Sequence, residues 1–154
     1  MPEITDILVK VKKLHSQAKF PIYAHKGDSC CDLYTVEDVT LPPGGRKLVP
    51  TGIAIQMAPG FGAHIQPRSG NAWKKGLSVL NSPGEIDNGY INEIKVILYN
   101  ASDKAVTILQ GEAIAQMGFH PVYTGNFLEV SEFEETDRGM NGFGSTGVVG
   151  DKKN

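Results

Sequence analysis

Four polar clusters in this chain could do chemistry on an anionic ligand, and the first is Pro67-Arg68-Ser69-Gly70. It combines a guanidinium group, a hydroxyl and a flexible backbone between a predicted strand and a predicted short helix. Backbone N–H groups at the start of a helix attract anions, and an arginine can bind two phosphate oxygens at once. The cluster therefore predicts a phosphate contact, although Ser69 could equally be an ordinary helix cap beside a solvated Arg68.

The second cluster is the segment 81–90, which reads Asn-Ser-Pro-Gly-Glu-Ile-Asp-Asn-Gly-Tyr between two apolar runs. Its Pro-Gly and Asn-Gly pairs are turn signals, and two turns are more than a simple hairpin requires. Backbone groups of such a loop could surround a flat ligand, with a carboxylate from Asp87 and an aromatic face from Tyr90. The alternative is a hairpin in which Asp87 only caps a turn.

Two further clusters are weaker when each is taken alone. Gln116 is a single amide near the end of a predicted strand, and it could be a ligand contact or a surface residue. Residues 138–147 read Arg-Gly-Met-Asn-Gly-Phe-Gly-Ser-Thr-Gly. Successive backbone N–H groups in glycine-rich turns can bind anions, and Phe143 could stack on a base. A disordered linker is the alternative, although it leaves a single Phe between glycines unexplained.

Other kinds of chemistry lack their sequence signals. There is no phosphate-binding G-x-x-x-x-G-K-[ST] loop, no zinc-deaminase pattern and no G-x-S-x-G nucleophile turn. The four histidines are scattered without the spacing of metal ligands. With 15 basic and 17 acidic residues the net charge is −2, which argues against a nucleic-acid binder that relies on backbone charge.

The signals of a membrane or secreted protein are also missing. No apolar run is long enough for a membrane helix, and the N-terminus lacks the order of a signal peptide. The two cysteines, Cys30 and Cys31, are adjacent. We therefore expect reduced thiols in a cytoplasmic protein, or in the host cytoplasm if the protein is viral.

The elements that must position these clusters are predicted to be short strands. The chain has 18 glycines and 9 prolines, which disfavours a helical bundle. Alternation of polar and apolar residues predicts strands over 63–66 and 113–119, and the run 94–99 predicts a buried strand. Many short strands between frequent turns indicate an all-β sandwich or barrel. One short helix is expected after Ser69, ending at Gly76.

The chain is expected to hold one β-domain over residues 1–130 and a C-terminal arm over residues 131–154. The arm begins with an acidic stretch and continues into a glycine-rich segment. Such a sequence does not form a core, and we expect it to be flexible until a ligand orders it.

Taken together and in this order, the clusters resemble the five motifs of the trimeric dUTP pyrophosphatases (dUTPases), over residues 24–147. The resemblance implies a β-jelly roll that hydrolyses dUTP to dUMP and pyrophosphate, which limits uracil incorporation into DNA and supplies dUMP for thymidylate synthesis. It also implies Mg²⁺ as cofactor and a homotrimer with active sites shared between chains, without direct nucleic-acid or membrane binding. The segments that carry the resemblance are 28–34, 67–77, 81–93, 111–116 and 138–147.

The resemblance also implies roles for individual residues. Asp87 would activate the attacking water as general base, and Asp32 would act on Mg²⁺ indirectly, through water, while the triphosphate holds most of the ion. The residues around uracil and deoxyribose would be Asn81, Gly84, Ile86, Tyr90 and Phe143. The residues around the phosphates would be Arg68, Ser69, Gly70, Gln116, Arg138, Gly144, Ser145 and Thr146.

Two positions depart from the family pattern, and two other functions stay open. Cys30 and Asn92 each stand where the family usually has glycine. Asn tolerates a left-handed backbone better than most non-glycine residues, so we expect the change at Asn92 to be mild. The alternative functions are a dCTP deaminase-like enzyme of the same fold and a non-catalytic nucleotide-sensing regulator. The presence of both Asp87 and Arg138 speaks against the regulator.

Overall fold

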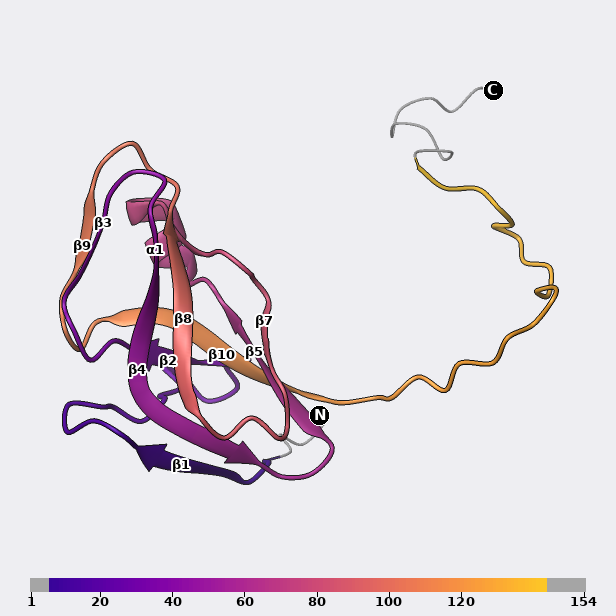
Figure 1. Ribbon diagram of the computed structural model, residues 1–154, viewed down its shortest axis with the longest axis horizontal. Coiled ribbons are helices and arrows are strands. Elements are labelled where there is room, and N and C mark those ends of the chain that lie inside the picture. The colour runs from indigo at the N-terminus through magenta and orange to yellow at the C-terminus, as the bar shows by residue number, and fades with distance from the viewer. Residues whose placement is uncertain (1–5, 144–154) are drawn as a thin grey trace. The chain divides into compact units, whose positions relative to one another are not determined.

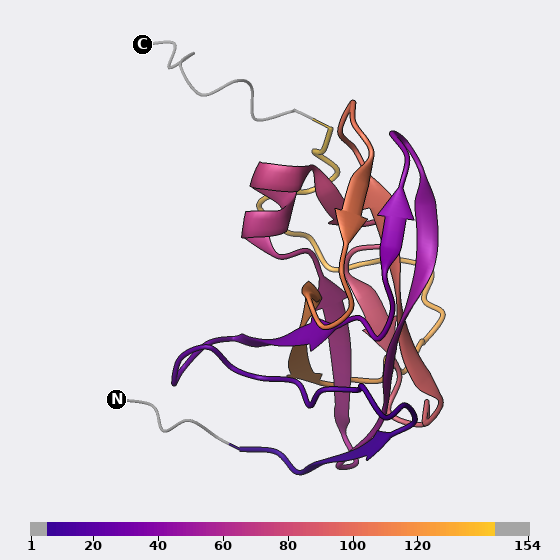
Figure 2. The same cartoon turned by 90° about the vertical axis from the view of Figure 1, so that its left-hand side faces the viewer.

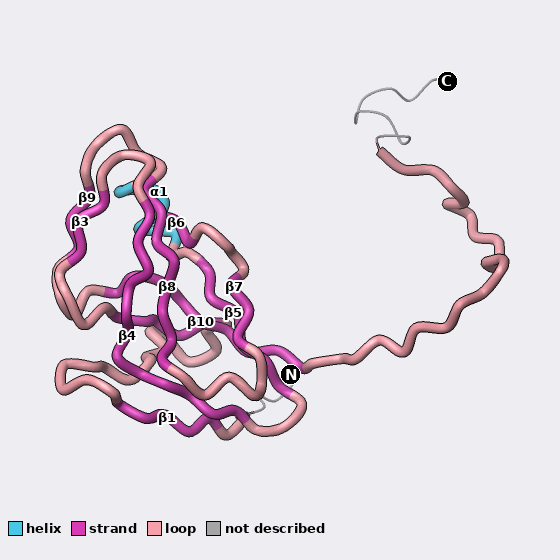
Figure 3. Tube along the Cα trace, viewed as in Figure 1, coloured by secondary structure: helices cyan, strands magenta, loops and turns pink. Residues whose placement is uncertain are grey.

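The computed structural model describes residues 6–143, which form ten short strands and one short helix (Figures 1 and 3). A compact unit extends to Tyr123. In chain order its elements are β1 (Val9–Lys13), β2 (Cys30–Tyr34), β3 (Val39–Leu41), β4 (Arg46–Met57), β5 (Phe61–Gln66), α1 (Ser69–Lys75), β6 (Leu77–Val79), β7 (Gly84–Ile86), β8 (Glu93–Asn100), β9 (Val106–Ile108) and β10 (Ala113–Pro121).

Two four-stranded antiparallel sheets make up most of this unit. Their strand orders are β1-β4-β8-β6 and β2-β10-β5-β7, and β3 pairs with β9 in a small third sheet. The buried core draws on both large sheets, with Ile53 and Ile94 from the first and Leu33, Ile65 and Met117 from the second. The helix lies to one side of the strands (Figure 2). The all-β, jelly-roll-like sandwich predicted from the short-strand pattern is confirmed.

Burial along the strands follows the predicted two-residue period, with one correction. The strands expected at 63–66 and 113–119 are present as β5 and β10, and on β5 both Ala63 and Ile65 are buried. On β8, Ile94 is buried but Lys95 is exposed. The run 94–99 is therefore buried on one face only, because the core covers a single side of this sheet.

The helix α1 has the expected bounds but a different first-turn arrangement. Gly76 ends it with a left-handed φ of 66°, which glycine adopts without strain. The capping position at the start is Arg68, in extended conformation, and no side chain caps the first turn. Ser69 is thus the first helical residue rather than its cap. No helix within residues 6–143 is long and apolar enough to cross a membrane.

The described part of the chain after the compact unit, residues 124–143, contains no strand or helix. We call these residues the C-terminal segment. The compact unit ends at Tyr123, before the predicted boundary at residue 130. The large apolar side chains of the C-terminal segment are exposed. Its hydrogen bonds are local, such as the one from Arg138 Nε to the Asn141 carbonyl at 3.1 Å.

Candidate active site

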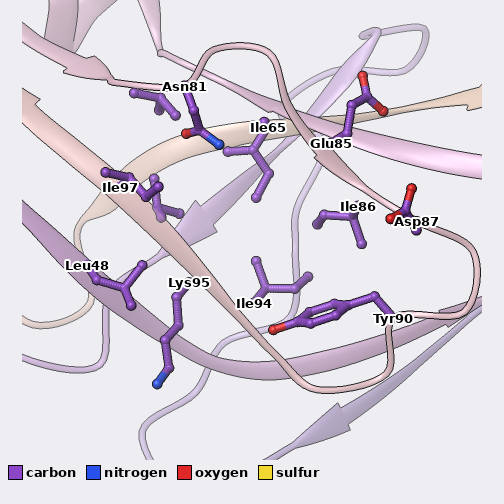
Figure 4. A pocket seen from close by; sticks show the side chains of 13 residues that line it. Leu48, Ile65, Asn81, Glu85, Ile86, Asp87, Tyr90, Ile94, Lys95 and Ile97 are labelled. Carbon is purple, nitrogen blue, oxygen red and sulfur yellow. The ribbon is translucent and has the colours of Figure 1, made fainter.

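A pocket of about 280 Å³ opens between β7 and β8 (Figure 4). Its size lies at the lower end of the roughly 300–1,000 Å³ typical of ligand sites, which suits a small ligand. Its floor is apolar, with side chains such as Ile65 and Val96. Five of the residues predicted around the base, the sugar and the attacking water line it together: Asn81, Gly84, Ile86, Asp87 and Tyr90.

The segment 81–90, here called the pocket loop, is held to the sandwich by a strand and by Asn88. Its residues Gly84–Ile86 form β7, which pairs with β5. Asn88 Nδ2 donates to the carbonyls of Ala58 and Phe61 at 2.8 and 2.7 Å, so it ties the loop to the turn between β4 and β5. From the sequence, Asn88 is only part of an Asn-Gly turn signal, and its anchoring role is not predictable because its partners are distant in the chain.

The Asp87 carboxylate is exposed at one end of the pocket, beyond Ile86 (Figure 4). Within residues 6–143 it makes no hydrogen bond and no ion pair. The structure therefore does not use Asp87 to cap a turn. An unpaired carboxylate at the edge of a pocket is free to accept a proton or a hydrogen bond from a ligand or a water molecule.

Asn81 and Gly84 face one another across the other end of the pocket. A Cβ atom on Gly84 would lie 3.0 Å from Asn81 Nδ2. Glycine at position 84 therefore allows the amide of Asn81 to approach the backbone of β7. Because β7 is the edge strand of its sheet, the Asn81 amide and the β7 backbone together offer both donors and acceptors to a planar ligand.

A second group of predicted residues gathers where the middle parts of β2 and β10 lie beside the end of β5, and we call Asp32, Arg68 and Gln116 the phosphate cluster. Arg68 Nε lies 2.8 Å from Asp32 Oδ1, and its Nη2 donates to Oδ2 at 3.1 Å. Asp32 is paired with Gln116 in the β2–β10 register, and Gln116 Nε2 donates to the Pro67 carbonyl at 3.0 Å. The two-point contact fixes the guanidinium plane of Arg68.

Ser69 and Gly70 follow this cluster in the first turn of α1, and both are exposed. A Cβ on Gly70 would meet open space, so the structure of this chain alone does not require glycine there.

Cys30 fits its position because the strand opposite carries a glycine. Cys30 pairs with Gly118 of β10, and a Cβ on Gly118 would lie 3.0 Å from Cys30 Sγ and 2.9 Å from the His64 ring. Gln66 Nε2 donates to Cys30 Sγ at 3.1 Å. Gly118 on the neighbouring strand therefore leaves room for the Cys30 side chain, which stands where the family usually has glycine. Both cysteines are free thiols, as predicted, and burial raises the pKa of the Cys31 thiol to about 11.

The structure corrects the reason given for Asn92, while the expectation that the change is mild stays a prediction. Among the described non-glycine residues only Phe143 has a positive φ, of 50°, so Asn92 does not adopt a left-handed backbone. Its side chain instead accepts a hydrogen bond from the Glu93 N–H at 2.7 Å. Asn92 replaces glycine by supplying a local hydrogen bond, not by tolerating an unusual backbone conformation.

The pocket and the phosphate cluster do not merge within one chain. None of the pocket-lining residues belongs to the phosphate cluster or to the first turn of α1. Arg138 and Phe143 lie in the C-terminal segment, which is a separate unit. Gly144, Ser145 and Thr146 lie outside the described residues.

The donor set of the described residues does not make a complete metal site. Residues 6–143 contain no group of three or more His, Cys, Asp or Glu side chains that could hold a metal ion. Both oxygens of Asp32 contact Arg68. Mg²⁺ prefers several oxygen ligands and keeps its waters, so the described residues would need further oxygen ligands from elsewhere to hold the ion.

Comparisons with known proteins agree with one another. A model of the dUTPase family matches residues 16–147. A deoxyuridine 5'-triphosphate nucleotidohydrolase from Hydrogenobaculum sp. is 53% identical over 139 residues, which cover 90% of this chain and 96% of that protein. The enzyme of the same name from Clostridioides difficile is 47% identical over 139 residues, which cover 90% of this chain and 97% of that protein.

A solved structure is similar over nearly the same range. The dUTPase of Staphylococcus bacteriophage 80alpha with dUpNHpp has a TM-score of 0.84 to this chain at 28% sequence identity. The match covers 92% of this chain and 99% of the phage chain.

Proposed function

The chain belongs to the dUTPase family, and from that premise we propose how its own residues divide the hydrolysis of dUTP among them. The products are dUMP and pyrophosphate, so the reaction removes a precursor of uracil in DNA and supplies a precursor of thymidylate. The observation that supports the assignment of roles is the pocket in which Asn81, Gly84, Ile86 and Tyr90 lie beside the unpaired Asp87 carboxylate.

Asp87 is the general base in this proposal. Its carboxylate accepts a proton from a water molecule, which attacks the α-phosphorus in line with the departing pyrophosphate. Exposure at the edge of the pocket leaves room for that water. Asn88, bonded to two carbonyls of the β4–β5 turn, keeps the neighbouring carboxylate at a fixed place.

Uracil is selected by the polar end of the pocket. The amide of Asn81 and the backbone of β7 pair with the base, and cytosine would leave buried donors and acceptors unpaired. A site built on such hydrogen bonds rejects the wrong ligand by up to about 10⁴–10⁵. Thymine is excluded by lack of space for its methyl group, between the strand at Ile86 and the pocket floor. The ring of Tyr90 packs under deoxyribose.

The triphosphate is bound by Arg68, Ser69, Gly70 and Gln116. Asp32 contributes by holding the guanidinium of Arg68 through its two-point contact, which presents the remaining N–H groups to phosphate oxygens. This assigns Asp32 an orienting role, which is compatible with an indirect effect on the metal ion through water.

The C-terminal residues complete the site when substrate is present. Phe143 stacks on uracil and excludes water. Arg138, Gly144, Ser145 and Thr146 bind the γ-phosphate, in keeping with the anion-binding character of glycine-rich backbone. The exposure of Phe143 supports this proposal, because its ring is available for a ligand.

A complete site requires more than one copy of the chain, and we place the pocket of one subunit against the phosphate cluster of another in a homotrimer. The pocket borders exposed apolar side chains that are unusual on a free sheet face, since Leu48 keeps 55% of its surface exposed and faces Ile97 on β8. A second copy would cover this face. We place the trimer in the cytoplasm because both thiols are free.

Mixing two inactive variants tests this arrangement. Asp87→Asn and Arg68→Ala each remove one half of a site, so refolding the two proteins together should restore part of the pyrophosphate release. Each variant refolded alone is the control. If Arg68 and Asp87 of one site came from the same chain, the mixture would stay as inactive as its components.

The triphosphate would supply most of the oxygen ligands for Mg²⁺, because the described residues contain no group of three or more side chains that could hold a metal ion. Bound there, the ion neutralises charge that develops on the leaving pyrophosphate. The residues of the chain bind and orient the phosphates, exclude water and move the proton at Asp87.

The deaminase and regulator alternatives are not favoured, because the family model and the relatives compared above are dUTP hydrolases. One assay separates all three functions. The protein is incubated with Mg²⁺ and dUTP, dTTP, dCTP or UTP, and pyrophosphate and ammonia are measured. Pyrophosphate from dUTP alone is expected, whereas ammonia from dCTP or the absence of turnover would overturn the proposal.

A further inference from the structure

The phenol of Tyr90 is bonded to Glu93, a residue at the start of β8 to which no role has been assigned. Tyr90 Oη donates to the Glu93 carbonyl at 2.8 Å. At the other end of the residue, the Tyr90 N–H donates to the Asp87 carbonyl at 3.0 Å. The residue is therefore held at its backbone and at its phenol, while 45% of its surface stays exposed. A fixed ring with one open face can serve as a platform for a sugar.

Glu93 lies opposite a β-bulge in β4. The pairing of β4 with β8 is regular up to Pro50, shifts register, and resumes at Ala54, which faces Glu93. Thr51, inside the bulge, is buried, and its hydroxyl donates to the Ile94 carbonyl at 2.7 Å. The bulge is therefore a packed part of the sheet and not a loose loop.

The carboxylate of Glu93 binds the tip of that bulge. The Gly52 N–H donates to Glu93 Oε1 at 3.0 Å, and the Gly52 carbonyl accepts from the Leu14 N–H at 2.7 Å. Gly52 has a φ of +68°, and a Cβ there would lie 2.7 Å from Val36 Cγ1. Only glycine fits this position, so the N–H that binds Glu93 has a fixed direction.

The second carboxylate oxygen of Glu93 points towards the pocket side of the strand. Lys95 Nζ, which belongs to a pocket-lining residue, lies 3.5 Å from Oε2. The Glu93 side chain is only 21% exposed, whereas that of Lys95 is 44% exposed. The contact to Gly52 is thus the better shielded of the two, and hydrogen bonds to ionised groups are stronger than neutral ones.

From this chain of contacts we infer that Glu93 is a positioning residue for the sugar subsite. Its carboxylate, anchored on the β4 bulge, fixes the backbone carbonyl that accepts from Tyr90 Oη, and this holds the ring where it excludes a ribose 2'-hydroxyl. The inference rests on the proposed function, in which Tyr90 packs under the sugar. A ring released from Glu93 would shift and make room for the extra hydroxyl, so the preference for dUTP over UTP would fall.

Steady-state kinetics on dUTP and UTP test the inference with three substitutions. Glu93→Ala should lower the dUTP-over-UTP preference in kcat/KM by about tenfold, mostly through KM, as expected for one lost charge-assisted hydrogen bond. Glu93→Gln keeps an oxygen that accepts from Gly52 and should stay within about twofold of the original preference. Glu93→Asp keeps the charge but is too short to reach Gly52, so it should resemble Glu93→Ala.

A matched control separates positioning from general stability. Asn100 lies at the far end of β8, where its buried amide donates to the Leu41 and Lys104 carbonyls at 3.0 and 2.7 Å. Asn100→Ala should lower the melting temperature without changing the substrate preference. If Glu93→Ala and Glu93→Asp lowered only the melting temperature, as this control does, the inference would be wrong.

The double variant Glu93→Ala with Tyr90→Phe adds an independent check. Tyr90→Phe removes the donor to the Glu93 carbonyl, and Glu93→Ala removes the carboxylate that fixes the backbone carrying that carbonyl. Because both changes act on the same path, their effects on the preference should combine to less than their sum. Fully additive effects would show that Glu93 does not influence the substrate preference through Tyr90. An unmodified protein that released no pyrophosphate from dUTP would instead overturn the proposed function itself, so the two failures are distinguishable.

Discussion

The pocket loop and the C-terminal segment both carry residues for the proposed substrate, but they are built in opposite ways. The pocket loop contains a paired strand, and Asn88 joins it to two distant carbonyls. The C-terminal segment contains no strand or helix among its described residues, and its hydrogen bonds are local. One region is fixed by the sandwich before any ligand arrives, whereas the described residues of the other form no strand pairing and only local hydrogen bonds.

This difference in support suits the two proposed tasks, which are reading the base and closing over the triphosphate. Distinguishing uracil from cytosine requires donors and acceptors at fixed positions, since a mobile group would adapt to either base. Closing over a triphosphate requires the opposite property. Ordering the backbone costs about 1–2 kcal/mol per residue, so closure should occur only when several charge-assisted contacts to phosphate offset that cost. The full triphosphate would then be needed for tight closure.

The largest expected effect comes from the fixed region, at Asp87. Asp87→Asn should reduce kcat by about 10²–10⁴-fold, because the amide cannot accept the proton of the attacking water. Binding of the analogue dUpNHpp, measured by calorimetry, should change little, since the amide has the same shape. Asp103→Asn, an exposed change outside the pocket, is the control. Unchanged turnover of Asp87→Asn would refute its role as base.

Removal of residues 138–154 should have the next largest effect. It tests the proposed role of the C-terminal residues in binding the substrate. Turnover of dUTP should fall by about 10²-fold or more, as for the loss of several phosphate-binding groups. The melting temperature should stay within a few degrees, because the deleted residues lie outside the compact unit. Phe143→Ala should give a smaller loss, confined to stacking. If the truncated protein were fully active, the C-terminal arm would have no role in the mechanism.

A substitution that detaches the pocket loop from the sandwich but keeps its proposed substrate-binding groups should have an intermediate effect. Asn88→Ala removes both bonds to the β4–β5 turn and should lower the free energy of unfolding by about 1–3 kcal/mol, measured by urea titration. It should also raise KM for dUTP, because the loop that carries Asp87 loses its anchor. Asn71→Ala, which removes one bond to the Ala113 carbonyl, is the control. A raised KM in both variants would show a general loss of stability.

The smallest effect is expected from a surface pair that also holds β7. His120 Nε2 lies 2.9 Å from Glu85 Oε2. Hydrogen bonds to the Pro121 carbonyl and to Glu85 raise the pKa of His120 above its usual 6.5. Since the folded state favours the protonated ring, this pair stabilises the protein fully below that value, and the contribution is lost as the pH rises through the raised pKa. The pair is exposed, so the contribution is small.

Urea unfolding at about pH 6 and about pH 8 measures this contribution. The His64 ring stacks on the His120 ring with centroids 5.7 Å apart, so the comparison needs a variant that changes His120 alone. The variant His120→Gln should therefore show a smaller difference between the two pH values than the original protein. An equal difference in both proteins would exclude a role for the pair.

Much of the fold followed from local patterns. The two-residue period of 63–66 and 113–119 predicted β5 and β10, and the end of α1 at Gly76 was readable because a left-handed residue favours glycine. The run 94–99 was predicted to be buried, yet Lys95 is exposed. An apolar run has no information about whether a second layer covers its outer face, so only packing could decide this.

In the candidate site, too, some features follow from the sequence and others depend on packing. The sequence by itself determined which side chains could do chemistry and placed Asn81, Asp87 and Tyr90 on one loop, because neighbours in the chain stay neighbours in space. Only the tertiary structure decided what holds that loop, since Asn88 and Glu93 find their partners across the sheets at Ala58, Phe61 and Gly52. Such contacts depend on strand register and on a bulge, and these are fixed by the packing of the whole sandwich and not by any local run of residues.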